Sequence, residues 1–107
     1  MSQVHYTSNI LTFNSGYAGT SEASHLGLVK SINCKITPPA AIAQGAQVTV
    51  ATLSNDFRPK AFTSAFAIAA NTVCYCDIDG DTGNIIVRPT TGSVGAGTNI
   101  WLRCVYI

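Results

Sequence analysis

The sequence predicts an all-β fold, an antiparallel β-sandwich or jelly-roll-like barrel in a single domain. Apolar and polar residues alternate with a period of two over several short segments, which is typical of half-buried strands. From Gln44 onward, turn residues separate these segments at intervals of roughly 9–16 residues, as in sandwiches and barrels. The chain has 107 residues, enough to bury one core but too few for a second domain.

The expected elements follow in chain order. Residues 10–13 are the one strand candidate near the N-terminus, and the polar stretch that follows, up to Ser24, is typical of a loop. Alternation predicts further strands over residues 28–36, 48–53, 62–68, 73–78, 85–87 and 99–107. We therefore predict one domain over residues 1–107, with 1–26 partly loop and 27–107 as the main β core.

The segment over residues 61–70 is the best helix candidate, because its alanines also suit a helix. However, Phe62, Phe66 and Ile68 occupy even positions of the segment, and Thr63 lowers its helix propensity. We therefore predict a strand here.

Charge is scarce in this sequence. Only 10% of the residues are charged, against about 25% in an ordinary soluble domain, and the formal net charge is +1. An apolar share of 47% excludes a disordered chain. The six basic residues are scattered, so we expect no nucleic-acid partner. A surface so poor in charge predicts that part of it packs against copies of the same chain.

The N-terminal residues have neither the basic nor the apolar region of a signal peptide. No apolar run approaches the roughly 18 residues of a membrane-spanning helix. We expect a product made in the cytoplasm without a signal peptide, or a piece of a longer chain, and no membrane insertion.

The four cysteines, Cys34, Cys74, Cys76 and Cys104, stand in mostly apolar, alternating segments. The favoured interpretation is four small buried hydrophobic side chains. A second interpretation is a disulfide such as Cys34–Cys104. A metal site is the least favoured, because pairs with C-x2-C spacing are lacking. We expect no bound metal and no cofactor.

The acidic segment Asp77–Gly83 resembles the start of a calcium-binding loop, but Thr82 and Arg88 stand where Gly and Glu are needed. We favour a hairpin turn, and a cation held weakly near Asp79 and Asp81 is the alternative.

The sequence contains no nucleophile, metalloprotease or phosphate-binding motif. We therefore predict that the chain is not an enzyme.

Trp101 is the single tryptophan, and it alternates with the apolar residues of the last segment. If its face lies outside the core, the ring is an interface anchor or a platform for a sugar ring, with Arg103 nearby to bind hydroxyl groups. The interpretation that we favour buries both faces, inside a sandwich or at a subunit interface, because the segment is largely apolar on both sides.

Residues 55–59, Asn-Asp-Phe-Arg-Pro, form a specific local motif. This motif is a turn in which Pro59 forces Arg58 into extended geometry, and Arg58 can then pair with Asp56 or cover an apolar surface. We favour a structural role for this motif.

The candidate ligand-binding residues are Trp101, Arg103, Arg58, Asp56, Asp79 and Asp81.

Six features follow one another between Val48 and Ile107. They are a strand ending in Leu53, the triplet Phe57-Arg58-Pro59, the strand over 61–70, the hairpin over 81–85, the Gly95-Ala96-Gly97 turn and the last strand over 100–107. This succession resembles the C-terminal head domain of receptor-binding and tail fibre proteins of tailed bacteriophages.

The resemblance implies a β-sandwich or barrel head that forms a homotrimer at the tail tip of a virion. It also implies binding to a host cell-wall polysaccharide or another surface glycan, contacts with other tail or baseplate proteins, and no fixed catalytic residues. Two alternatives stay open, a purely structural virion or baseplate domain without a ligand, and a small hydrolase.

Overall fold

The computed structural model describes residues 5–107, which form nine strands and one short 3-10 helix, η1, over Asn55–Phe57. The strands are β1 His5–Ser8, β2 Leu11–Phe13, β3 Ala18–Leu26, β4 Val29–Thr37, β5 Val48–Leu53, β6 Thr63–Ala69, β7 Thr72–Ile78, β8 Asn84–Pro89 and β9 Ile100–Tyr106. Seven of them match predicted strands. Strand β2 matches the candidate over residues 10–13, and β4 to β9 match the segments that alternate between apolar and polar residues, so these predictions are confirmed. Among these residues, no helix has the length and hydropathy that a membrane span requires.

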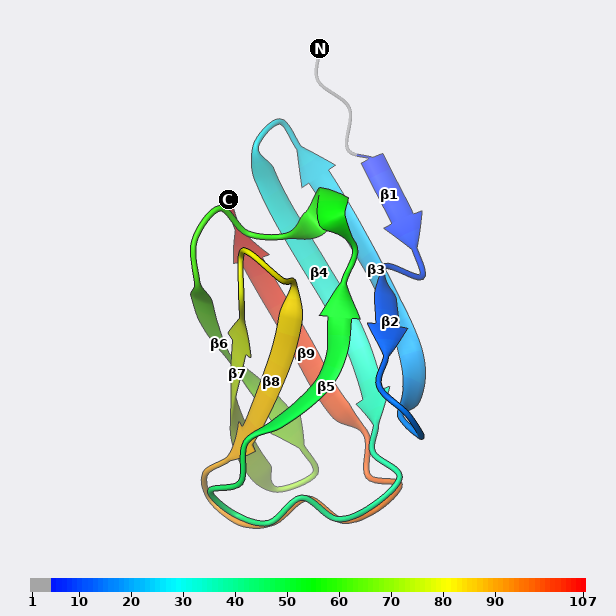
Figure 1. Cartoon of the computed structure of the whole chain (residues 1–107), viewed down its shortest axis with the longest axis vertical. Coiled ribbons are helices and arrows are strands. Elements are labelled where there is room, and N and C mark those ends of the chain that lie inside the picture. The colour runs from blue at the N-terminus through cyan, green and yellow to red at the C-terminus, as the bar shows by residue number, and fades with distance from the viewer. Residues whose placement is uncertain (1–4) are drawn as a thin grey trace.

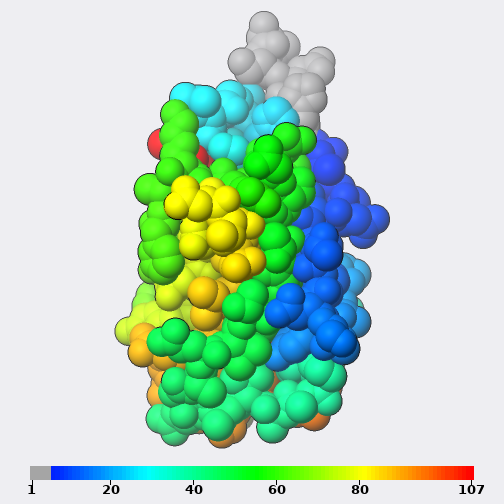
Figure 2. Space-filling view, in the orientation of Figure 1, coloured from blue at the N-terminus to red at the C-terminus, as the bar shows by residue number. Residues whose placement is uncertain are grey.

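All strand pairs are antiparallel, and the strands form one sheet in the order β1-β3-β4-β9-β6-β7-β8-β5-β2. The sheet curls so that β5 and β8 lie in front of β4 and β9 (Figure 1). Side chains cover the face formed by β2, β5 and β8 (Figure 2). The predicted antiparallel sandwich or jelly-roll-like barrel is confirmed.

The two edge strands of this sheet, β1 and β2, are neighbours in the chain. At the bend between them, the Asn9 backbone N–H donates to the Ser21 carbonyl at 2.9 Å. The Ile10 N–H donates to the Ser21 hydroxyl oxygen, also at 2.9 Å. Both edges therefore meet at β3, and Ser21 closes the curled sheet there.

The core lies between the two curled faces of the sheet and follows from the alternation of each strand. Every second residue of β9 points inward, and Ile100 and Leu102 have no exposed surface. The Tyr106 hydroxyl, at the end of the same row, donates to the Phe57 carbonyl and ties β9 to η1. Other fully buried aliphatic side chains of the core include Ile32, Ile36, Val50, Leu53, Ile78, Ile85, Val87 and Val94.

The interpretation of residues up to Ser24 as a loop is wrong. Ala18–Leu26 forms β3, which pairs with β4 along its whole length, and His5–Ser8 forms β1. The inward positions of β3 are filled by Ser21 and Ala23, and these small residues do not form a hydrophobic pattern. Pairing with β4 buries these residues, and an alternation of large apolar side chains, the usual sign of a strand, is missing from this segment.

Strand β6 confirms the preference for a strand over a helix. Its inward residues are the alanines Ala67 and Ala69, whereas Phe66 and Ile68 are 63% and 55% exposed. The large apolar side chains of β6 therefore contribute to the outer surface of the sheet and not to its core.

The tight turn between β6 and β7 holds Ala70 at a φ of 53°. An L-residue other than glycine is strained in this left-handed region. We expect Ala70→Gly to raise the free energy of unfolding by about 0.5–1 kcal/mol, measured by urea denaturation. The neighbouring Asn71→Gly is the control and should give no gain, because the structure has no positive φ at Asn71. A variant Ala70→Gly that is no more stable than the wild type would contradict the strain.

Candidate functional site

The outer face of β3, β4 and β9 carries polar side chains in rows that cross the strands. Glu22 is paired with Asn33, and Asn33 is paired with Arg103. Neighbouring strands lie about 4.8 Å apart, so this row is roughly 10 Å long from its carboxylate to its guanidinium end. We call Glu22, Asn33 and Arg103 the Asn33 row; it offers an acceptor, an amide and a cation along one line.

The next row along the strands contains Thr20, Lys35 and Trp101, which are paired in the same way. Trp101 is 53% exposed, and Ile68 of β6 lies directly opposite it on its other side. The favoured interpretation buried both faces of the last strand, inside a sandwich or at a subunit interface. Burial inside the fold is wrong, because the chain leaves this face open, and burial at a subunit interface stays a prediction. The outward interpretation of Trp101 holds, because β4 and β6 flank β9 without covering its outer face.

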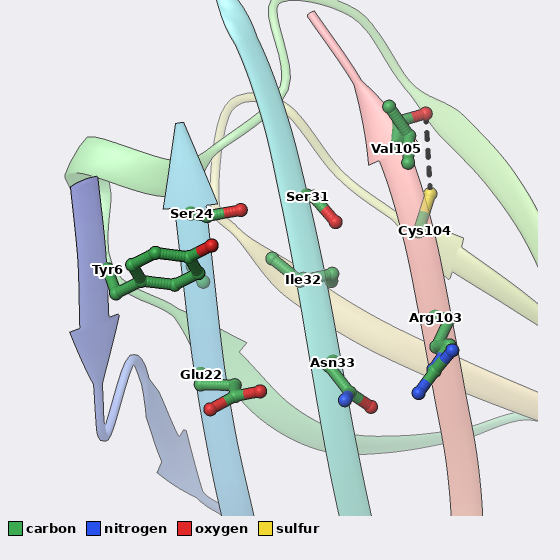
Figure 3. A pocket seen from close by; sticks show the side chains of 10 residues that line it. Tyr6, Glu22, Ser24, Ser31, Ile32, Asn33, Arg103, Cys104 and Val105 are labelled. Carbon is green, nitrogen blue, oxygen red and sulfur yellow. Dashed lines mark hydrogen bonds between the residues drawn. The ribbon is translucent and has the colours of Figure 1, made fainter. Parts of the chain in front are cut away.

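Two adjoining hollows lie along these rows. One, of about 400 Å³, is bounded by Tyr6, Glu22, Asn33, Arg103 and Val105, and Figure 3 shows it from close by. The other, of about 420 Å³, lies between Glu22, Asn33 and Trp101. Since they share Glu22 and Asn33, we treat them as one groove across β1, β3, β4 and β9, named here the β4 groove.

The structure brings Trp101 and Arg103 together in this region, as two successive outward residues of β9. The other four predicted residues belong to a turn region elsewhere. Nη1 of Arg58 donates to the Asp81 carbonyl at 3.1 Å, and its Nε donates to the Leu53 carbonyl at 3.5 Å. Arg58 thus joins the end of β5 to the β7–β8 turn through carbonyls and not through Asp56, in keeping with a structural role.

Asp79 also serves the β7–β8 turn. Its carboxylate Oδ1 accepts the backbone N–H of Asp81 at 2.8 Å and that of Thr82 at 3.4 Å. The hairpin interpretation of this acidic segment is confirmed by the antiparallel pairing of β7 with β8. Within residues 5–107, no three acidic, histidine or cysteine side chains are grouped so that they could hold a metal ion.

Sequence reasoning missed four residues of the β4 groove: Tyr6, Glu22, Asn33 and Lys35. The alternation of β4 does contain a signal, since Asn33 and Lys35 occupy the polar positions between its buried residues. Tyr6 and Glu22 lie on β1 and β3, which the sequence analysis did not identify as strands. Their positions follow only from the pairing of these strands.

None of the four cysteines forms a disulfide, and Cys34, Cys74 and Cys76 are buried while Cys104 is half-buried. Their interpretation as small buried hydrophobic side chains is confirmed for Cys34, Cys74 and Cys76, and Cys104 is buried only in part. Burial, with a smaller effect of the neighbouring Cys104, raises the pKa of the Cys34 thiol to about 12. Burial likewise raises the pKa of Cys74 and Cys104. Protonated thiols are poor nucleophiles, so these side chains are unsuited to covalent catalysis.

The raised pKa of the Cys34 thiol makes the free energy of unfolding depend on pH in the alkaline range. The Cys34 thiol keeps its proton when folded up to about pH 12, whereas its ordinary pKa is 9.0. Above pH 9 the unfolded chain loses this proton first, so we expect the free energy of unfolding to fall between pH 9 and 12. Urea denaturation at pH 8 and pH 10 measures the loss, and Cys34→Ala should show a smaller one. Equal stability of the wild type at both values would contradict the burial of the thiol.

No protein-family model and no curated protein matches the chain. A comparison with solved structures shows that the fold is that of the head domain of the lactococcal phage bIL170, a receptor-binding domain. The crystal structure of this head domain superposes on the chain with a TM-score of 0.66. The two chains are 19% identical, and the match covers 94% of this chain and 96% of that one. The resemblance expected from the sequence is thus confirmed at the level of the fold.

Proposed function

We propose that this chain is a receptor-binding head domain of a phage tail that recognises a saccharide on the surface of the host cell. The observation that carries the proposal is the β4 groove, where a half-exposed tryptophan stands beside a row of hydrogen-bonding side chains. The similarity to the head domain of phage bIL170 supports the same function and a place in the virion.

Saccharide recognition suits this combination of groups. The flat Trp101 ring offers an apolar surface to the C–H face of a sugar ring. Glu22 accepts hydrogen bonds from hydroxyl groups, Arg103 donates to them, and Asn33 does both. A ligand that lay over the Asn33 row would meet all three groups without any movement of the backbone, since the register of β3, β4 and β9 holds them in line.

The experiment is a glycan array of bacterial cell-wall saccharides, together with an adsorption assay in which the purified domain competes with phage for host cells. We expect binding to one class of saccharide and inhibition of adsorption. Absence of both would remove the proposal and favour a purely structural virion or baseplate domain.

We also propose that the domain assembles as a homotrimer through the outer face of β6 and β7. Phe66, Ile68 and Tyr75 are exposed there and form an apolar patch, with the rings of Phe66 and Tyr75 5.2 Å apart. The Arg88 guanidinium stacks 4.8 Å from the centre of the Tyr75 ring. Exposed apolar patches mark interaction surfaces, and a net charge of +1 leaves little repulsion between copies.

Phe66→Glu should convert the trimer to a monomer, because it places a carboxylate in the middle of the apolar patch. Multi-angle light scattering measures the mass, and the wild type should have three times the mass of one chain. Leu28→Glu is the matched control, since Leu28 is an exposed apolar residue outside the patch. A wild-type monomer in dilute solution would contradict the trimer.

A further inference from the structure

Two aromatic side chains stand at opposite ends of the β4 groove. Trp101 lies on β9, and Tyr6, which is 78% exposed, lies on the edge strand β1. Figure 3 shows the Tyr6 ring lying over β3, beside Ser24 and towards the hollow. An exposed tyrosine on an edge strand needs no explanation by itself, but this one forms a wall of the same hollow as Glu22 and Arg103.

The register gives the separation of the two rings. Tyr6 is paired with Ser24, Ser24 with Ser31, and Ser31 with Val105, so the row of Tyr6 reaches β9 four residues beyond Trp101. Three strand spacings across and four residues along a strand place the two backbone positions roughly 20 Å apart. A single sugar ring cannot touch both aromatic side chains, whereas a chain of several sugar units can.

The surface between the rings is lined with hydrogen-bonding groups. The Asn33 row crosses this path, and Ser24 and Ser31 continue the row of Tyr6 across β3 and β4. The large aliphatic residues that line this hollow are Val105, which is exposed, and Ile32, which is buried. An extended ligand on the path would therefore find donors and acceptors along its length and an aromatic face at each end.

Strand β1 is held in place for such a role. It makes four consecutive residue pairs with β3, and the hydrogen bonds from Asn9 and Ile10 to Ser21 fix the chain directly after it. Because Asn9 has a φ of 59°, the chain turns there towards β5 while β1 stays beside β3. The position of Tyr6 over the hollow thus follows from the same bonds that close the sheet.

We propose that the β4 groove binds an extended oligosaccharide, which lies across β9, β4, β3 and β1 with Trp101 and Tyr6 as the stacking platforms at its two ends. This inference rests on the proposed function and adds the length of the ligand to it. Tyr6 is a specificity-determining residue for long saccharides, and it makes no contact with a single sugar unit bound at Trp101.

The test measures dissociation constants for a size series of the saccharide with the highest signal on the array, from mono- to hexasaccharide, by isothermal titration calorimetry. The wild type should bind the longer members more tightly. Tyr6→Ala should weaken binding of the hexasaccharide by about 3- to 10-fold and leave the monosaccharide unchanged. Trp101→Ala should weaken both. Tyr6→Phe keeps the ring and should bind nearly as the wild type, and Leu26→Ala is a control on an exposed residue outside the groove.

Two results would overturn the inference while leaving the proposed function intact. One is an equal affinity for mono- and hexasaccharide, and the other is a variant Tyr6→Ala that binds the hexasaccharide as the wild type does. If the wild type neither binds a saccharide on the array nor competes with phage for host cells, the proposed function fails and the inference fails with it. Circular dichroism of each variant should show an unchanged β spectrum, since Tyr6 is an exposed side chain.

Discussion

Trp101→Ala is expected to raise the dissociation constant for the saccharide with the highest signal on the glycan array by at least about 30-fold. It should also remove most of the competition with phage for host cells. The expectation follows from the place of this ring in the β4 groove, beside Arg103 and Lys35 on paired strands. Tryptophan is among the side chains that dominate binding energy when a partner covers them. Calorimetry with the saccharide and adsorption counts on host cells measure the effect.

Two controls make the Trp101 result specific. Trp101→Phe retains an aromatic face and should keep much of the affinity. Leu28→Ala removes an exposed apolar side chain, 64% accessible, from the turn between β3 and β4 and should have no effect. Light scattering of each variant separates a loss of binding from a loss of assembly. An unchanged affinity after Trp101→Ala would refute the role of this residue in the groove.

Leu102→Ala should give the largest change in stability. Leu102 has no exposed surface and lies at the centre of β9, between Cys34 of β4 and Ala67 of β6. Both neighbours are small, so leucine fills the space between them and its loss leaves a cavity. The expected cost is about 2–5 kcal/mol, a large share of the roughly 5–15 kcal/mol that stabilises a domain. The midpoint of thermal unfolding should fall by roughly 10–30 °C.

The measurement of Leu102→Ala requires a fixed protein concentration, because assembly makes the unfolding midpoint depend on concentration. Leu28→Ala serves again as the control, since an exposed position outside the core should change stability by less than about 0.5 kcal/mol. A loss below about 1 kcal/mol for Leu102→Ala would show that the inner face of β9 is not tightly packed.

Much of the fold could be predicted because its inner residues are large and apolar. From Ile32 in β4 and from Ile100 in β9, apolar residues, cysteines and a tyrosine among them, occupy every second position, and this pattern is visible in the sequence alone. In β3 the inner positions hold Ser21 and Ala23, so the same geometry leaves no hydrophobic pattern. In β6 the alternation gave the right element, although the side facing the core is the one with alanines.

The candidate site could be predicted only where one strand contains it. Trp101 and Arg103 are two residues apart on β9, so their common face follows from the period of a strand. Asp79 and Arg58 were predicted as binding residues because they are charged residues near turns. In the structure, their hydrogen bonds stabilise the β7–β8 turn and the end of β5. Tyr6, Glu22 and Asn33 come from three other strands, and nothing local to each of them indicates that they share a groove.

The sequence by itself therefore determined the class of fold, most of the strands and the outward position of Trp101 relative to Leu102, because the side on which a strand residue lies depends on the backbone of that strand alone. Only the tertiary structure decided that Ala18–Leu26 is a strand, that β1 and β2 meet at Ser21, and that the Asn33 row forms. These features depend on which strands pair and in which register. Hydrogen bonds between segments far apart in the chain set both, and no local pattern of residues specifies them.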